Sequence, residues 1–501
     1  NFLWELTMTP SSLEARNTAT SHPSNHPSNG TETLVKRRQS DLAKRRSFTD
    51  YLPNPIVDHL LTPVQHSAAK AARQIIFLLL SKLKQGHLTV IETFHQSDHV
   101  ATKIASKAAT HKTFGVSVMN TEPVTQSPVS DTQRTLGEQI GNHSLAVTLT
   151  IHSPQVYQHL LTGGSIAFAD DYIDGLWQAD DLTAFLRLIA RNLTLINTIE
   201  AKFANMTKRW EHRQHRNRHN DKNNAKSNIL AHYDIGNAMY ALFLDERMMY
   251  SSAIYPTPSS SLAAAQTHKL AKICELAELS ADDHVIEIGT GWGGFAIYAA
   301  TQYGCRVTTT TISDAQYEEA KRRIAAANLT DKITLLKQDY RELTGKYDKL
   351  VSIEMIEAVG HEYLPDFFAQ CNRLLKDNGL MVLQAITFND RGYQKYLHAV
   401  DFIQTHVFPG GCLLSNSEIL SQARDHTDMQ VTSLIDYGYD YARTLIDWRY
   451  NFMQALPQLK ALGYDDAFMR LWHFYFAYCE AGFLEKTIGV VQVRLEKAQY
   501  R

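Results

Sequence analysis

The sequence predicts an α/β fold: a doubly wound, Rossmann-like sheet, preceded by a smaller α+β domain and a disordered N-terminal tail. Three observations support this prediction. The chain has 501 residues, more than one core usually encloses, so two or more domains are expected. Apolar strands alternate with amphipathic helices through the C-terminal half, as in a mostly parallel sheet. At residues 285–295 a short apolar strand ends in glycines and opens an apolar helical segment.

The first 50 residues are the predicted disordered tail. They are rich in Ser, Thr, Asn, Pro and charge, and they contain the tandem HPSNHPSN. Such a composition cannot bury enough apolar surface to offset the entropy of ordering.

Residues 51–205 are predicted to form the small α+β domain. A helical apolar pattern covers residues 75–83, and strict alternation over 145–151 indicates a strand. Gly163 and Gly164 then punctuate the chain before an apolar helix over about 181–195.

Residues 206–228 form a predicted basic linker, whose cations are Lys208, Arg209, Arg213, Arg216, Arg218, Lys222 and Lys226. Phe203, Met206 and Trp210 fall on one helical face, a pattern typical of an interfacial helix on anionic lipid. A solvated linker and a nucleic-acid contact are the alternatives. Histidines 212, 215 and 219 share a helical face, but polar linkers collect histidines, so no metal site is predicted.

Residues 229–501 are predicted to form the main domain, with strands at 285–288, 306–312, 333–337, 349–353 and 380–386 and helices near 313–328 and 363–375. Ligands of such sheets bind beyond the carboxyl ends of the strands. The glycine turn, Thr311, Asp339 and Glu354 are therefore expected to converge on one crevice.

The glycine turn indicates a nucleotide ligand but does not show which nucleotide binds. Gly289, Gly291 and Gly294 satisfy G-x-G-x-x-G, which suits a nicotinamide dinucleotide or S-adenosylmethionine. A nicotinamide enzyme usually places an acid about 20 residues on, to hold the ribose. Residues 307–312 read VTTTTI and carry no acid, and Asp314 lies just beyond, which is mild evidence against nicotinamide.

Composition excludes some partners and sets the expected compartment. The net charge of −2 gives no global case for nucleic acid, and none is expected as a partner. Five cysteines without a C-x-x-C pair suit a reducing compartment. No stretch reaches the ~18 apolar residues of a membrane span. We therefore expect a cytoplasmic protein, peripheral on the inner face of the membrane; a homodimer is a candidate assembly.

Several motifs in order resemble the cyclopropane-fatty-acyl-phospholipid synthase family, which is related to the mycolic acid cyclopropane synthases. They run from about residue 140 to the C-terminus: GGSIAFADDYIDGLW, AHYDIGNAMYALFLDERMMYSSAIY, EIGTGWGG, TISDAQ, SIEMIEAVG, DFIQTHVFPGGCLLS and AYCEAGF. Independent motifs in the right order make chance similarity a poor explanation.

The resemblance implies a methyltransferase domain that binds S-adenosylmethionine. Tyr250 and Ser251 would close over its methionine end, while Thr311 and Gln316 would border the ribose and adenine. The implied cofactor site comprises Tyr250, Ser251, Glu287, Gly289, Thr290, Gly291, Trp292, Gly293, Thr311, Ile312, Gln316 and Asp339. The family usually has Asp-x-Gly-Cys-Gly in the turn, whereas this chain has Glu287 and Thr290.

The resemblance also implies a reaction: methyl transfer to a cis double bond of an unsaturated acyl chain in a phospholipid bilayer. A base then removes a proton so that a cyclopropane ring closes, and in the family this base is a bound bicarbonate. Glu357 matches the carboxyl residue of the bicarbonate site and Tyr441 its phenol, while Ser252 and Ile386 match backbone contacts. A carboxyl beside an anion is plausible if it is protonated or linked to the anion through a hydrogen bond, since two bare anions would repel.

One departure from the family keeps other products open. Gln384 stands where ring-forming members usually have His, and it cannot act as a titrating acid or base. Ser252 likewise replaces a common Cys. A lipid C-methyltransferase giving a methyl-branched or methylene chain is the first alternative, and a nicotinamide-dependent oxidoreductase the second. Cys479 is a further candidate catalytic residue, but a Cys in an aromatic stretch is more often a buried hydrophobe.

Overall fold

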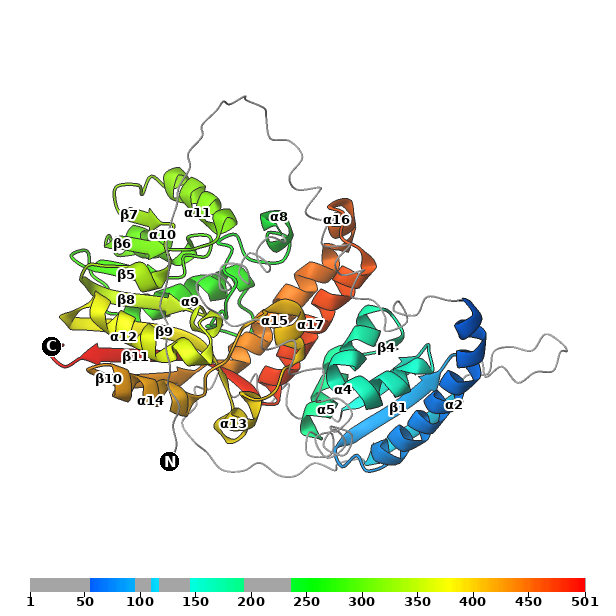
Figure 1. Cartoon of the computed structure of the whole chain (residues 1–501). Coiled ribbons are helices and arrows are strands. Elements are labelled where there is room, and N and C mark those ends of the chain that lie inside the picture. Colours follow the sequence, from blue (N-terminus) through cyan, green and yellow to red (C-terminus); the bar gives the residue numbers. More distant parts are fainter. Residues whose placement is uncertain (1–54, 95–109, 117–144, 193–235, 501) are drawn as a thin grey trace, which may run out of the picture. The chain divides into compact units, whose positions relative to one another are not determined.

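The computed structural model describes residues 55–94, 110–116, 145–192 and 236–500 (Figure 1). From Pro55 onward these residues belong to one compact unit. The predicted tail and the predicted basic linker, with Phe203, Met206 and Trp210, lie outside the described residues. The division into a 51–205 domain, a linker and a 229–501 domain stays a prediction.

A seven-stranded sheet with the order β10-β11-β9-β8-β5-β6-β7 forms the main domain and confirms the predicted fold class. Five neighbouring strands are parallel: β5 (His284–Ile288), β6 (Arg306–Thr310), β7 (Ile333–Leu336), β8 (Tyr347–Ile353) and β9 (Leu375–Phe388). Antiparallel β11 (Ile488–Lys497) and β10 (Met429–Asp436) extend the sheet beyond β9. These last two strands were not predicted.

Helices cover both faces of the sheet, as a doubly wound fold requires. The helices are α9 (Leu262–Leu276), α10 (Gly294–Gln302), α11 (Asp314–Ala326), α12 (Leu364–Leu374) and α14 (Asn416–His426), with short α8 (Asn237–Tyr240) and α13 (Tyr393–Tyr396). Adjacent residues of one strand enter different cores: Val285 packs in the core with α9 and α10, and Ile286 in the core with α12 and α14. The period of two along a strand produces this division.

Between β10 and β11 the chain forms α15 (Gly438–Gln454), α16 (Leu456–Ala461) and α17 (Asp466–Leu484). Helices α15 and α17 pack side by side (Figure 1). Part of the aromatic stretch on α17 belongs to the core, since Trp472, Phe474 and Phe476 are buried.

The N-terminal part is α+β, as predicted. Its four-stranded sheet has the order β2-β1-β3-β4, formed by β1 (Gly86–Glu92), β2 (Thr110–Val116), β3 (Ala146–Ile151) and β4 (Trp177–Ala179). Its helices are α2 (Pro55–Leu80), α4 (Gln155–Ile173) and α5 (Leu182–Arg191).

Gly164 punctuates the chain before the predicted apolar helix, as expected: its backbone is non-helical (φ 61°) and kinks α4. One local prediction in this part needs correction. Helix α2 ends at Leu80, so Leu83 is buried outside it. In contrast, Asp181 begins α5 as expected, because its carboxylate accepts a hydrogen bond from the Ala184 amide.

Within the described residues, no helix is both long and apolar enough to cross a membrane.

Candidate functional site

A cavity of about 530 Å³ lies at the carboxyl ends of β5, β6, β8 and β9. The glycine turn, Thr311, Asp339 and Glu354 all line it, as the sheet topology predicted. One portion is polar and follows the strand ends. The other is mostly apolar and is lined by Ile403, Phe408, Leu413, Leu445, Tyr475, Tyr478, Cys479, Phe483 and Ile488.

The glycine turn provides a backbone cradle between β5 and α10. Gly289, Gly291 and Gly293 have φ values of 101°, 54° and 86°, which favour glycine. A Cβ built on Gly291 meets no described atom within 4 Å, so its open side faces the cavity. Gly294 serves packing instead, because a Cβ there would lie 2.3 Å from Met249 Sδ.

Glu287 and Thr290 form the buried support of the turn. Thr309 donates a 2.5 Å hydrogen bond to Glu287 Oε2, and its hydroxyl lies 2.6 Å from that of Thr290. Burial raises the pKa of Glu287 to about 8, although the Thr309 hydrogen bond and Lys269 act against this rise. Both predicted residues line the cavity.

The residues expected around ribose and adenine also line the polar portion of the cavity. Thr311 donates a 2.8 Å hydrogen bond to Gln316 Oε1, which links the end of β6 to the first turn of α11. Ile312 lies beside them. Asp339 follows β7 and receives two hydrogen bonds from Arg341, of 2.9 and 2.6 Å. That ion pair occupies both carboxylate oxygens of Asp339.

Tyr250, Ser251 and Trp292 enclose this portion of the cavity. Tyr250 donates to the Tyr475 hydroxyl at 3.1 Å. Trp292 lines the cavity but is only 2% exposed, and its indole donates to Asn237 Oδ1 at 2.9 Å. Trp292 therefore packs against α8 and also lines the cavity.

Lys269 is a buried cation that the sequence analysis missed. It lies on the buried face of α9, and its Nζ donates to Ser251 Oγ at 2.8 Å. Burial lowers the pKa of Lys269 to about 8, while the negative charges of Glu354, Asp245 and Glu287 raise it. The pattern Gln266, Lys269, Leu270, Ile273 on one face was the available signal.

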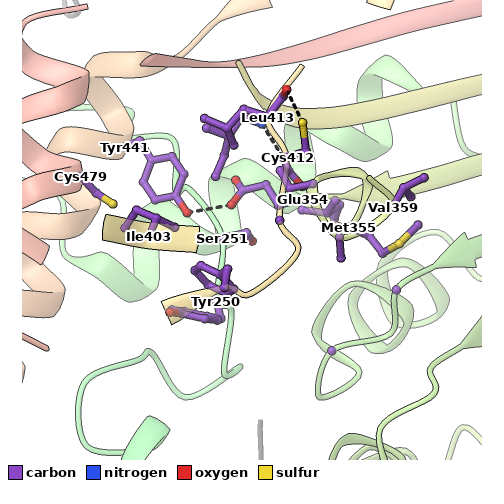
Figure 2. A pocket seen from close by; sticks show the side chains of 18 of the residues that line it. Tyr250, Ser251, Glu354, Met355, Val359, Ile403, Cys412, Leu413, Tyr441 and Cys479 are labelled. Carbon is purple, nitrogen blue, oxygen red and sulfur yellow. Dashed lines mark hydrogen bonds between the residues drawn. The ribbon is translucent and has the colours of Figure 1, made fainter. Parts of the chain in front are cut away.

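Glu354 is the centre of a hydrogen-bond network that the sequence analysis did not assign. Its Oε1 accepts from the Ser252 amide at 2.9 Å and from Gln384 Nε2 at 2.7 Å. Its Oε2 accepts from the Tyr441 hydroxyl at 2.8 Å (Figure 2). The structure thus brings Ser252, Gln384 and Tyr441 together, as predicted. The anion that they surround is the Glu354 carboxylate, whereas the resemblance implied a bicarbonate.

Glu357 lies beside this network and makes a different contact. Its Oε1 accepts from the Ile386 amide at 2.6 Å, and its buried Oε2 has no hydrogen-bond partner among the described residues. Burial and the neighbouring Glu354 charge raise the pKa of Glu357 to about 8. Glu357 is therefore protonated near neutral pH. Burial also raises the pKa of Glu354 above its usual value, and the three donors and the Lys269 charge oppose this rise.

This pKa predicts how stability depends on pH. Between the unfolded pKa of about 4.3 and the folded value of about 8, the native protein holds a proton that the unfolded chain has released. Stability from this group is present below the unfolded pKa and is lost as pH rises through the folded pKa. Glu357→Gln should therefore gain stability over the wild type as pH rises, by about 1.4 kcal/mol for each pH unit and on the order of 4 kcal/mol between pH 5 and pH 8.

Thermal unfolding across this pH range measures the effect of Glu357→Gln. The exposed Glu362, five positions along, is the control, because its change to Gln should leave the pH dependence unaltered. Parallel curves for the wild type and Glu357→Gln would mean that Glu357 is not held protonated.

Cys479 lines the apolar portion, where burial raises the pKa of its thiol. A protonated thiol is a weak nucleophile. We expect Cys479→Ser to retain turnover within about ten-fold, since covalent catalysis would instead lose several orders of magnitude. Steady-state rates of the folded variant decide this; complete loss would make Cys479 a nucleophile.

Comparison with known proteins shows the family to which this chain belongs. Residues 220–493 match the family model of mycolic acid cyclopropane synthetase. A tuberculostearic acid methyltransferase of Mycobacterium tuberculosis is 35% identical, covering 69% of this chain and 82% of the relative. The cyclopropane-fatty-acyl-phospholipid synthase of Escherichia coli K12 is 32% identical, covering 70% of this chain and 88% of the relative.

The chain belongs to the mycolic acid cyclopropane synthetase family. Among solved structures, a mycolic acid cyclopropane synthase complexed with SAH and CTAB superposes with a TM-score of 0.51 at 27% identity, covering 54% of this chain and 98% of the other. Membership confirms the predicted family and identifies an S-adenosylmethionine-dependent methyltransferase that modifies lipids. Family membership therefore identifies S-adenosylmethionine, and not a nicotinamide dinucleotide, as the ligand of the glycine turn.

The residues fit S-adenosylmethionine but not bicarbonate. The glycine cradle is open toward the cavity, and a Cβ at Gly291 would fill it. In contrast, Ser252, Gln384 and Tyr441 already donate to Glu354. A bicarbonate would have to displace a carboxylate from all three donors, and we route no step through it.

Proposed function

We propose that this enzyme transfers a methyl group from S-adenosylmethionine to the cis double bond of an unsaturated phospholipid acyl chain and closes a cyclopropane ring. The observation that supports this proposal is the single cavity, in which the glycine cradle is continuous with an apolar portion lined by aromatic and aliphatic side chains. A carboxylate, Glu354, lines the same cavity. A methyl donor, an acyl chain and a base would then share one enclosed space.

The protein's own groups would act by position and charge. S-adenosylmethionine supplies an electrophilic methyl group when bound. The apolar portion would hold the alkene and exclude water, which prevents capture of a carbocation. Tyr250, Tyr441 and Tyr475 line the cavity, and their rings could stabilise a passing cation, as could the Glu354 carboxylate.

A second product class is favoured by a specific observation. Gln384 replaces a titrating His, and one relative is named a tuberculostearic acid methyltransferase. Loss of a proton from a chain carbon instead of the new methyl would give a methyl-branched alkene. Methyl transfer is common to all of these products. A methylene group would form if a hydride shift moves the cation to the methyl-bearing carbon before a proton leaves the new methyl.

Methyl-deuterated S-adenosylmethionine and vesicles of a cis-unsaturated phospholipid would separate these outcomes. Mass spectrometry of the acyl chains should show two deuterons if the proton leaves the new methyl, and three if it leaves the chain. Magnetic resonance then separates a ring from a methylene group. Tight binding of the cofactor without label in any acyl chain would refute a phospholipid substrate.

A further inference from the structure

The backbone at Glu354 is held in an unusual conformation. Glu354 follows β8 directly and has a φ of 49°, in the left-handed region that non-glycine residues avoid. This conformation costs about 1 kcal/mol. The Glu354 amide donates to the Gln384 carbonyl at 2.8 Å, which fixes the residue against β9. Local strain of this kind is typical of functional positions.

Three donors from separate elements converge on the carboxylate. They are the Ser252 amide, the Gln384 side chain on β9 and the Tyr441 hydroxyl on α15, at 2.7 to 2.9 Å. Burial raises the pKa of Tyr441 well above its usual value, and so does the Glu354 charge, so this phenol keeps its proton and donates. The carboxylate therefore has the environment of a bound anion.

A second layer orients the Gln384 donor. Gln492 on β11 is buried and donates to Gln384 Oε1 at 2.9 Å. Because the Gln384 oxygen is occupied, its NH₂ group points to Glu354. Gln384, which stands where the family usually has His, is therefore oriented by the neighbouring Gln492 amide.

Charge at the site also suits one anion and disfavours a second. The buried Lys269, whose Nζ donates to Ser251 Oγ, lowers the pKa of Glu354 against the effect of burial. Burial and the Glu354 charge raise the pKa of Glu357 to about 8, so this neighbouring carboxyl is protonated near neutral pH. A bicarbonate added beside Glu354 would place two anions within a few ångströms, with no donor left from this set.

We propose that Glu354 takes the place of bicarbonate and is itself the catalytic base, which makes turnover independent of bicarbonate. This inference rests on the proposed function. The alkene π pair forms a bond to the methyl carbon as the carbon–sulfur bond breaks, and the sulfur keeps that electron pair. The other alkene carbon becomes cationic. Glu354 removes a proton from the new methyl, and the C–H pair closes the ring, leaving Glu354 protonated until solvent accepts the proton.

The first test measures anion binding and needs no turnover. Glu354→Gly should leave three unpaired donors around a space that an anion fills. Added bicarbonate should raise the unfolding temperature of this variant, by linkage, but not that of the wild type. Sodium chloride at equal pH and ionic strength is the reference salt.

Glu278→Gly is the matched control. Glu278 also has a left-handed backbone, with φ 51°, so both substitutions relieve the same type of strain. It lies at the end of α9, outside the residues that line the cavity. Its variant should show no bicarbonate effect and full turnover.

The second test measures label transfer in carbon-dioxide-free buffer. The wild type should keep its rate, and Glu354→Gln should lose about 100-fold or more, as for other positioned bases. Bicarbonate should restore much of the rate to Glu354→Gly but not to Glu354→Gln, whose amide still fills the space. Calorimetric binding of S-adenosylmethionine verifies that both variants are folded.

The inference is overturned if bicarbonate raises the unfolding temperature of the wild type, or if the wild type transfers label more slowly without bicarbonate. It is also overturned if Glu354→Gln transfers label at the full rate. Failure of the proposed function gives a distinct pattern. The wild type would then transfer no label to phospholipid. The unfolding temperatures measured with bicarbonate would still show whether Glu354 occupies an anion site.

Discussion

Gly291→Val is expected to abolish binding of S-adenosylmethionine while the protein remains folded. The space beyond Gly291 is open, so the branched side chain would project into the cradle where the cofactor lies. Its φ of 54° also disfavours a β-branched residue. A steric conflict of about 3 kcal/mol lowers affinity by roughly 100-fold or more. Titration calorimetry with S-adenosylmethionine measures this loss.

Gly463→Val is the matched control for backbone strain. Gly463 has a φ of 92°, and a Cβ there also meets nothing within 4 Å, but it does not line the cavity. This variant should lose stability and keep affinity. Unchanged affinity in Gly291→Val would show that the cofactor does not approach the glycine turn.

Tyr441→Phe is expected to lower kcat by about 100-fold with little change in cofactor affinity. The substitution removes the hydroxyl that donates to Glu354 Oε2 at 2.8 Å. A hydrogen bond to a charged group contributes about 1.5–3 kcal/mol, and a displaced base loses further rate. Single-turnover label transfer at saturating S-adenosylmethionine isolates the chemical step.

Tyr255→Phe separates catalysis from stability. Tyr255 and Tyr441 are each 5% exposed, and each donates to a carboxylate of a side chain at 2.8 Å. Tyr255 bonds Asp447 and does not line the cavity. Both variants should lose similar stability, and only Tyr441→Phe should lose rate. Equal rates in the two variants would remove Tyr441 from the reaction.

The parallel half of the sheet was predictable because its signals are local. Strands predicted at 285–288 and 349–353 lie within β5 and β8, since buried parallel strands are short apolar runs. Strands β10 and β11 were missed because their pairing depends on the chain returning through α15 and α17. β9 was also predicted too short, since its first residues, 375–379, are largely polar.

The sequence by itself determined the fold class, the family and the glycine cradle, because each depends on residue types at close spacing. Only the tertiary structure shows that three donors surround the Glu354 carboxylate. Ser252, Gln384 and Tyr441 are 102, 30 and 87 positions from Glu354, and they meet only when β8, β9 and α15 are packed together. Hydrogen bonds depend on distance and direction in space, and the pattern of residues along a chain does not contain either quantity.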